Sequence, residues 1–335
     1  NPNSQTSHNP ITRYVNSSTG NDSTGDVTSG TPWKTFHHAY TSSKDADTLD
    51  ATGTFDWTDA DETGDVSVTG YTIDKDFNIL GHGPDQTIFQ AGPTASYSNG
   101  KRIFTIDSGI TASIQGVTIK NGYISWSDRG MGGGIRNDGT LTLSDSEVTD
   151  SFAGGCGYCG SGYGGGLYNT GTATVTNSSF YDNSSWYYGG GVSSTGTLTI
   201  TNSSIIDNTT TGDQSSSNYG AGIGIPGGTT NITNCTITGN VASGSGTSSY
   251  RVGGMYIGGA STNVYLKNTI IAGNSTNYAS STKNNIYVAG GTLNNNGYNI
   301  IGKSNGYTST TGDWSDPEDD GTFELNTVGT TGSLS

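Results

Sequence analysis

Cationic residues are scarce in this 335-residue chain. Only 13 lysines and arginines stand against 28 aspartates and glutamates, which gives a formal net charge of −15. A protein that binds nucleic acid needs a basic surface to neutralise phosphates, so this composition excludes nucleic acid as a partner and disfavours strongly acidic partners. No run of 18 apolar residues occurs, so the sequence predicts no membrane span.

Cysteine is also rare, with three residues in the chain. Cys156 and Cys159 form a C-G-Y-C pair, but a zinc or redox site would need a second ligand pair or a βαβ context, and the sequence offers neither. We expect a small disulfide that closes a loop, with two free thiols or a metal as the alternatives. Cys235 lies in an apolar run and is expected to be a small buried packing residue.

Apolar residues make up only 30% of the chain, whereas glycine contributes 54 residues. Without internal order, a chain of this composition is expected to be largely disordered. The chain is ordered instead by a repeat. Between residues 132 and 240 the phrase GGGIRNDGTLTLSDSEVTD recurs as GGGLYNTGTATVTNSSFYDN, GGGVSSTGTLTITNSSIIDN and, more loosely, AGIGIPGGTTNITNCTITGN.

The repeat predicts a stack of β-coils. Its units align at intervals of 25 to 35 residues on Gly81, Gly116, Asp145, Asn177, Asn202, Asn234, Asn268 and Gly297, and such a period indicates a solenoid. Apolar residues alternate within each unit, as in Leu141 and Leu143, so the segments are strands with one buried face. Six residues later a second column holds Asn183, Asn208, Asn240 and Asn274. Amides stacked from coil to coil can satisfy one another at tight turns, which favours an all-β, single-domain parallel β-helix.

The two ends of the chain resemble a known family. The segments YV, TGND and TPWKTF between residues 14 and 36 look like the N-terminal cap of secreted right-handed parallel β-helix proteins, and NNNGYNIIGKSNG followed by TGDW resembles their terminal coil. The resemblance covers about residues 11–325, and it implies a right-handed β-helix that is secreted or held at the surface of bacterial or archaeal cells. We expect an N-terminal arm and cap over 1–65, coils over 66–302 and a C-terminal coil or tail over 303–335.

The cap segment also carries the candidate helix and the candidate metal site. Trp33, Phe36 and Tyr40 share one helical face after Thr31-Pro32, which predicts a short capping helix. The acidic segment 56–65 has the spacing of the first half of a calcium loop, so calcium is the one candidate cofactor, although the bidentate glutamate is replaced by Gly70 and a solvated acidic loop is the alternative. The candidate ligands are Asp59, Asp61, Thr63 and Asp65.

Two asparagines in the first 21 residues are the candidate glycosylation sites. Asn16 and Asn21 stand in N-x-S/T sequons outside the regular part of the repeat. Six of the other seven sequons fall on the columns of asparagine, where a Ser or Thr after the stacked residue creates the motif as a by-product.

An aromatic column gives the main functional hypothesis. Tyr163, Tyr188 and Tyr219 each precede the first glycine of a coil, and Trp186 and Tyr187 stand beside them. Aromatic faces bind sugar rings without needing charge, so these residues are the candidate ligand-binding strip. The alternative is a ladder of tyrosines packed against their own loops.

The sequence allows two other functional hypotheses besides a ligand-binding strip. Asp150, Asp182 and Asp207 are carboxylates on neighbouring coils, as a polysaccharide lyase or glycoside hydrolase requires, but they recur because the turn recurs. Paired threonines such as Thr140 and Thr142 resemble an ice-binding array, although the pattern ends within a few coils. The sequence therefore favours a non-enzymatic extracellular protein, structural or adhesive, whose partners are cell-surface glycans or further copies of itself in a homo-oligomer or filament.

Overall fold

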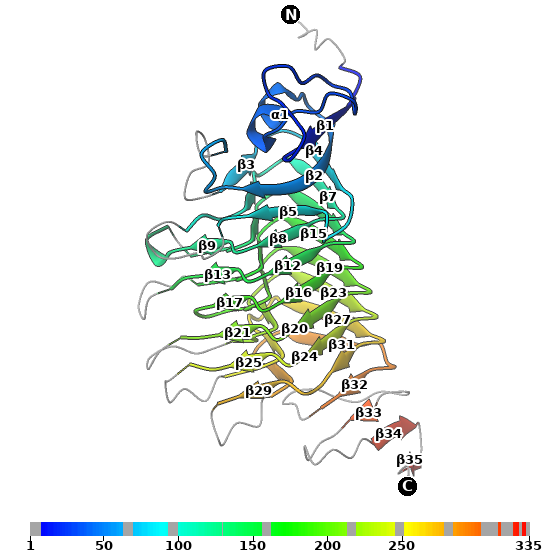
Figure 1. The fold of residues 1–335 in the computed structure, drawn as a ribbon. Coiled ribbons are helices and arrows are strands. Elements are labelled where there is room, and N and C mark those ends of the chain that lie inside the picture. Colours follow the sequence, from blue (N-terminus) through cyan, green and yellow to red (C-terminus); the bar gives the residue numbers. More distant parts are fainter. Residues whose placement is uncertain are drawn as a thin grey trace, which may run out of the picture.

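The computed structural model describes residues 8–62, 70–92, 100–128, 130–155, 162–212, 219–244, 251–277, 284–302, 314–315, 324–327 and 330–332. The chain winds into a rod of stacked coils in which corresponding strands of successive coils pair in parallel (Figure 1). Three sheets run along the rod. Strands that hold the same position in successive coils pair with one another to form them. Figure 1 shows the one α-helix of the described residues at the end of the rod that contains the N-terminus.

The largest sheet has 21 strands and consists of two parallel ladders that share strand β2. The first ladder is β1 (Thr12–Asn16), β2 (Thr48–Asp56), β4 (Phe77–Gly81), β7 (Thr111–Gln115), β11 (Thr140–Ser144), β15 (Thr172–Thr176), β19 (Thr197–Thr201), β23 (Thr229–Thr233), β27 (Asn263–Lys267) and β31 (Thr292–Asn295). The second ladder continues from β2 through β5 (Thr87–Gln90), β8 (Thr118–Lys120), β12 (Glu147–Thr149), β16 (Ser179–Tyr181), β20 (Ser204–Ile206), β24 (Thr236–Thr238), β28 (Ile270–Ile271) and β32 (Ile300–Ile301).

Two smaller sheets complete the coil. The eight-stranded sheet is β3 (Tyr71–Ile73), β6 (Phe104–Ile106), β10 (Ile135–Asn137), β14 (Leu167–Asn169), β18 (Val192–Ser194), β22 (Ile223–Ile225), β26 (Met255–Ile257) and β30 (Ile286–Val288). The six-stranded sheet is β9 (Tyr123–Ile124), β13 (Phe152–Ala153), β17 (Ser184–Ser185), β21 (Thr209–Thr210), β25 (Val241–Ala242) and β29 (Ser275–Thr276). A single 3-10 turn, η1 (Trp126–Asp128), follows β9.

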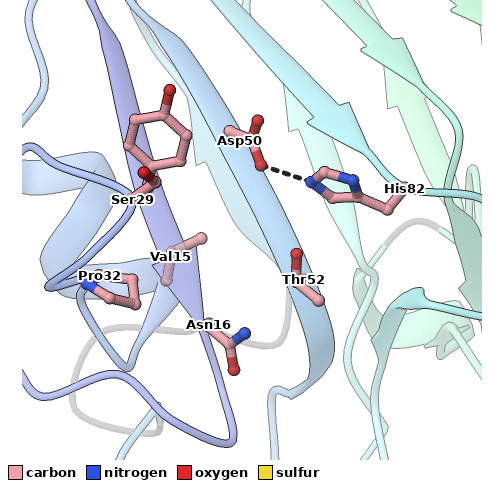
Figure 2. Close-up of a pocket in the computed structure, with 8 residues that line it drawn as sticks. Val15, Asn16, Ser29, Pro32, Asp50, Thr52 and His82 are labelled. Atoms are coloured by element: carbon pink, nitrogen blue, oxygen red, sulfur yellow. Dashed lines mark hydrogen bonds and ion pairs between the residues drawn. The ribbon is translucent and has the colours of Figure 1, made fainter.

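The N-terminal segment covers the first coil, as expected, but its helix starts later than the sequence suggested. Helix α1 (Phe36–Ser42) is capped by Thr35, whose side chain accepts a hydrogen bond from the backbone N–H of His38. The Thr31-Pro32 pair therefore precedes the helix and does not begin it, because the Thr35 hydroxyl supplies the missing acceptor at the N-terminus. Figure 2 shows β1 beside β2 in this region, with Val15 and Asn16 on β1 and Asp50 and Thr52 on β2.

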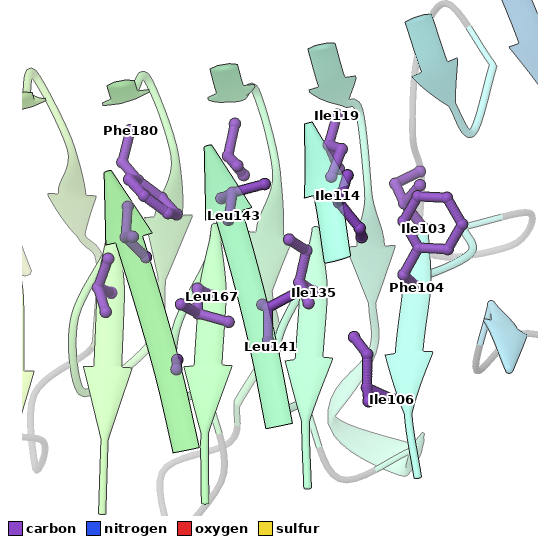
Figure 3. Packing of buried hydrophobic residues seen from close by; sticks show 14 of the residues in the cluster. Ile103, Phe104, Ile106, Ile114, Ile119, Ile135, Leu141, Leu143, Leu167 and Phe180 are labelled. Carbon is purple, nitrogen blue, oxygen red and sulfur yellow. The ribbon is translucent and has the colours of Figure 1, made fainter. Parts of the chain in front are cut away.

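The core is a continuous column of aliphatic and aromatic side chains inside the rod. Figure 3 shows Leu141 and Leu143 of β11 pointing into the same interior as Ile135 and Leu167 of the eight-stranded sheet. All four side chains are fully buried. At the cap, Phe36 of α1 closes the column by packing on the rings of Phe89 and Phe104. Each coil is thus stable only with its neighbours, as in repeat proteins generally.

The predicted inner column of asparagines is confirmed. Each amide donates to the next along the rod, from Asn183 to Asn208 at 3.1 Å, from Asn208 to Asn240 at 3.0 Å and from Asn240 to Asn274 at 2.8 Å. These side chains are at most 4% exposed. Because each amide also donates to a backbone carbonyl, the column satisfies polar groups that would otherwise be buried without partners.

The other predicted column lies outside the core. Asp145, Asn177, Asn202 and Asn234 are exposed, and each has a positive φ between 50° and 56°. Their side chains still form a chain of hydrogen bonds 3.0 to 3.3 Å long. The physical reason for Asp or Asn at these positions is the left-handed turn, which these residues tolerate better than other residues with a side chain.

Cys235 is buried, as predicted, and it also takes part in hydrogen bonds. It is free, 3% exposed, and occupies a ladder of hydroxyl residues formed by Ser146, Ser178, Ser203 and Thr269. Its Sγ donates to the carbonyl oxygen of Thr233 at 3.1 Å, while its backbone N–H donates to the Thr269 hydroxyl at 3.3 Å. Burial raises the pKa of the Cys235 thiol, which keeps it protonated as a donor.

The expected domain boundaries stay predictions, and the structure describes paired strands on both sides of them. Within the N-terminal segment, β1 pairs with β2, and β2 pairs with β4. After β32, the second ladder continues into β33 (Trp314–Ser315), which pairs in parallel. β34 (Glu324–Thr327) and β35 (Thr330–Gly332) then pair in antiparallel fashion and end the ladder. The expected C-terminal tail therefore contains an antiparallel hairpin.

Candidate functional site

The predicted aromatic residues form a longer surface strip than the sequence indicated. Isolated backbone bridges join Tyr163 to Tyr188 and Tyr188 to Tyr219. The strip also includes three tyrosines from the eight-stranded sheet that sequence reasoning missed. We call the whole set the tyrosine strip: Tyr163, Tyr168, Tyr187, Tyr188, Tyr219, Tyr256 and Tyr287.

The register of the eight-stranded sheet explains why the strip is continuous. Tyr168, Ser193, Gly224, Tyr256 and Tyr287 follow one another at a single outward position of β14, β18, β22, β26 and β30. The two small residues lie where the loop tyrosines cross the sheet. A side chain at Gly224 would come within 3.0 Å of the Cβ of Tyr188 and of the backbone oxygen of Tyr219. The signal available in the sequence was a tyrosine at this position in three of these five coils.

The rings of the strip pack mainly on one another. Tyr188 and Tyr219 are stacked with centroids 4.5 Å apart, and Tyr219 lies 4.4 Å from Tyr256. Tyr168 and Tyr256 are 8% exposed, while Tyr163, Tyr188 and Tyr219 are partly buried. The sequence left two interpretations open, a ligand-binding strip and a packed ladder of tyrosines. In the structure the tyrosines form a ladder and also remain in part at the surface. It leaves ring edges, more than free ring faces, to contact a ligand, and the hydroxyls of Tyr188 and Tyr168 already hydrogen-bond to Tyr256 and Thr195.

The phenols of Tyr163, Tyr168 and Tyr188 stay neutral over the physiological pH range. Burial raises the pKa of Tyr163, Tyr168 and Tyr188, with neighbouring tyrosines adding to the effect for Tyr163 and Tyr188. Beside them, Arg136 is paired with Asp138 at 2.7 Å, so its charge is neutralised. The strip therefore offers uncharged hydrogen-bonding groups on an aromatic base.

Tyr187 belongs to the strip, and Trp186 precedes it in the chain. The Tyr187 ring lies 6.3 Å from that of Tyr163, and both Trp186 and Tyr187 are partly buried. Gly162, with a φ of +98°, allows this approach, because a Cβ there would lie 2.3 Å from the Cβ of Trp186. The buried indole N–H of Trp186 has no acceptor among the described residues.

The three aspartates considered as catalytic acids occupy a turn position. Asp150, Asp182 and Asp207 are exposed, with φ between 51° and 55°. The same position is taken by Asn121 in an earlier coil and by Gly239 in a later one, also with positive φ. Local burial, Asp150 and Asp207 raise the pKa of Asp182. The left-handed backbone at this position thus accounts for the Asp, Asn or Gly found there in these coils. Asp182 differs from the other two aspartates in its raised pKa.

Two carboxylates in or near this row have side-chain partners, and the first is Asp150, which accepts a hydrogen bond from the Thr149 hydroxyl at 3.1 Å. The hydroxyl of Tyr181 donates to Glu147 at 2.9 Å, on the outer face of β12 and β16. Burial and this hydrogen bond raise the pKa of Tyr181 to about 12, so the phenol stays protonated at neutral pH and acts as the donor to the Glu147 side chain.

A polar groove follows the turn between the first and second ladders. It has a volume of about 490 Å³ and is lined by Asn177, Asn202, Asn234, Ser179, Ser204, Thr236 and two buried serines. None of its lining side chains is ionisable at neutral pH, so the groove has hydrogen-bonding groups but no acid or base.

A small pocket of about 200 Å³ lies beside the cap, and Figure 2 shows the residues that line it. His82 hydrogen-bonds to Asp50 at 2.6 Å, which gives the pocket a histidine–carboxylate pair. Ser29 and Thr52 also line it, but neither hydroxyl hydrogen-bonds to His82 among the described residues.

The candidate calcium loop is described only in part. Asp61 forms an ion pair with Lys34, and the Asp59 carboxylate accepts from the backbone N–H of Asp61. Thr63 and Asp65 lie outside the described residues, and no group of three metal-ligating side chains occurs within them. Calcium binding stays a prediction, and Lys34 already neutralises one of the proposed ligands.

Glu62, next to this loop, is a buried acid of the cap with a raised pKa. It is 5% exposed and accepts hydrogen bonds from the backbone N–H groups of Phe36 and His37 at 2.6 and 3.1 Å, so it caps the start of α1. Burial raises its pKa to about 7 despite these hydrogen bonds. Its contacts give it a structural role.

The remaining sequence predictions are untested. Cys156 and Cys159 lie outside the described residues, so the disulfide stays a prediction. Asn16 and Asn21 each accept two backbone N–H groups in a turn through Oδ1, and Asn21 is exposed. Glycosylation of either residue stays a prediction. Among the described residues, no helix is long and apolar enough to cross a membrane.

Comparison with known proteins identifies the fold. Neither a protein-family model nor a curated protein matches the sequence. A solved pectate lyase, Pel9A, superposes with a TM-score of 0.51 at 14% identity, over 92% of this chain and 74% of that one. A pectin methylesterase bound to a hexasaccharide has a TM-score of 0.44 at 13% identity, over 84% and 81%. A rhamnogalacturonan lyase has a TM-score of 0.39 at 13% identity, over 86% and 87%.

The chain folds as a right-handed parallel β-helix. This confirms the predicted fold class and the predicted resemblance. At this identity the likeness extends to the fold alone, and the chemistry must be argued from the residues of this chain.

Proposed function

We propose that this protein is a non-enzymatic extracellular β-helix protein that binds a neutral polysaccharide along the tyrosine strip. The observation that carries the proposal is the continuity of the strip, which follows the eight-stranded sheet from Tyr163 to Tyr287 through ring contacts. A linear array of phenols and ring edges suits a linear polymer of neutral sugars. Phenolic hydroxyls bind sugar hydroxyls, and ring edges cover the apolar faces of the sugars.

Charge supports a neutral ligand. The net charge of −15 would repel pectate and other polyanions, and Arg136 at the strip is already paired with Asp138. A polysaccharide as the partner class is also supported by the fold, which is shared with a protein named for its action on pectate. An extracellular location is consistent with a polysaccharide ligand and with this fold.

The second candidate is a polysaccharide lyase or glycoside hydrolase acting through the aspartate row. The raised pKa of Asp182, caused by burial, Asp150 and Asp207, is the observation in its favour. The recurrence of Asp, Asn or Gly with positive φ at this position in other coils supports a turn role instead.

A polymer panel tests the proposal. The protein is run in native gels containing galactomannan, xyloglucan, mixed-linkage glucan or polygalacturonate, and the same polymers are incubated with it and assayed for new reducing or unsaturated ends. We expect retardation by at least one neutral polymer, none by polygalacturonate, and no new chain ends. Retardation only by the acidic polymer, or by none, would contradict the proposal. New ends that disappear in Asp182→Asn would establish the enzyme instead.

A further inference from the structure

A second surface, on the first ladder, carries a regular array of threonines. On β11, β15, β19 and β23 the twelve outward positions hold ten threonines, Ser144 and Asn231. The threonines form three ranks along the rod: Thr140, Thr172, Thr197 and Thr229, then Thr142, Thr174 and Thr199, then Thr176, Thr201 and Thr233. The third rank, which sequence reasoning did not include, turns two columns into a two-dimensional array.

The hydroxyls of this array have no hydrogen-bond partners among the residues that the structure describes. None of the ten threonine side chains hydrogen-bonds to another described residue, whereas Ser146, Ser178 and Ser203 in the adjacent turn all do. Thr140, Thr142, Thr172 and Thr197 are exposed, and the other six are partly buried. The array therefore faces outward with its hydrogen-bonding capacity unused.

Backbone pairing fixes the spacing of the array. Strands of neighbouring coils lie about 4.8 Å apart, and alternate residues of a strand are about 6.7 Å apart. Threonine is β-branched, so its hydroxyl and methyl group have few rotamers to lose on binding. The face thus presents a preformed grid of alternating hydroxyls and methyl groups.

The chemistry of the face limits what can cover it. No charged side chain occupies any of the twelve positions, although the chain carries 28 acidic residues, so the face has no electrostatic attraction for a charged partner. No aromatic residue occupies them either, and the nearest, Tyr265, stands on the next strand, β27. Sugar rings are usually held by aromatic contacts, which this face lacks.

We propose that the threonine face binds the surface of an ice crystal. The occupant is an uncharged, periodic lattice of water, whose molecules are small enough to be held between the ranks by hydroxyls and kept ordered beside the methyl groups. The face ends where the pattern does, at Gln115 on one side and at Tyr265 and Lys267 on the other. The inference is independent of the polysaccharide proposal, because it rests on a different sheet.

The test measures uptake of fluorescently labelled protein into a slowly growing ice hemisphere, together with the growth of ice grains during annealing. Wild-type protein is compared with Thr174→Lys at the centre of the array and with Thr236→Lys, a matched change on the outer face of the second ladder. Circular dichroism and thermal melting confirm that each variant is folded. Thr174→Ser, which keeps the hydroxyl and loses the methyl group, serves if the lysine variant does not fold.

We expect wild type and Thr236→Lys to enter the ice and slow grain growth equally, and Thr174→Lys or Thr174→Ser to lose activity at least about tenfold. Exclusion of the wild type from ice would overturn the inference, as would equal uptake of the Thr174 and Thr236 variants. Binding of the wild type to crystalline cellulose or chitin that Thr174→Lys abolishes, without ice uptake, would assign the face to a solid polysaccharide and also overturn it.

Discussion

The asparagines of the inner column are buried and those of the outer column are exposed, so we expect them to contribute differently to the stability of the fold. Asn208 donates to the carbonyls of Phe180 and Ile206 and to Asn240, and accepts from the backbone and side chain of Asn183. Asn208→Ala leaves several buried polar groups unpaired, so we expect the free energy of unfolding to fall by about 3 kcal/mol or more. Denaturant titration followed by circular dichroism measures the loss.

Asn202→Gly is the matched control, because Asn202 is exposed and glycine tolerates its φ of 52°. We expect a loss below about 1 kcal/mol. Equal losses in the two variants would show that the inner column has no special role.

Glu62 gives a pH dependence whose sign can be worked out. Its pKa is about 7 in the folded chain against 4.5 for the free side chain, so the folded state holds the proton more tightly. The resulting stability is fully present below pH 4.5 and is lost as the pH rises through about 7, by about 3 kcal/mol in all. We expect Glu62→Gln to remove this slope from thermal melting curves, and an unchanged slope in the variant would contradict the assignment.

At the scale of one element, the hydroxyl ladder predicts the effect of replacing Cys235. Ser146, Ser178 and Ser203 hold the same place in earlier coils, so Cys235→Ser keeps a donor and an acceptor. We expect it to melt at the wild-type temperature or above. Cys235→Val has a similar volume but no donor, and we expect it to lose about 1 to 2 kcal/mol. Equal stability of the two variants would mean that the thiol only fills space.

Some elements of the structure could be predicted from the sequence, and others could not. The strands, the inner asparagine column and the fold follow from periodicity, because coils stacked in register repeat both the apolar alternation and the polar turns. The start of α1 was wrong, because the Thr35 side chain decides it and Thr31-Pro32 does not. Tyr168, Tyr256 and Tyr287 were missed because their place in the strip depends on the register of the eight-stranded sheet, which the sequence of one repeat unit does not reveal.

At the scale of the whole molecule, the hairpin β34–β35 bears on self-association. Its antiparallel strands close the second ladder beyond β32 and β33, and an exposed parallel edge is a template for pairing with another chain. Self-assembly into an oligomer or filament stays a prediction. We expect a chain shortened by residues 303–335 to form larger particles in light scattering than the full chain, with the difference growing with concentration. Identical particle sizes would show that the hairpin does not protect the end.

The central claim is that the tyrosine strip is the polysaccharide site. The most direct test is the dissociation constant, by affinity electrophoresis, of wild type, the double variant Trp186→Ala and Tyr187→Ala, and Tyr265→Ala, for the neutral polymer that retards the protein most. Tyr265 is the matched control, since it is 38% exposed on the other side of the coil, on β27. The account predicts that the double variant binds at least about tenfold more weakly and that Tyr265→Ala binds like wild type. Unchanged binding by the folded double variant, or an equal loss in Tyr265→Ala, would contradict it.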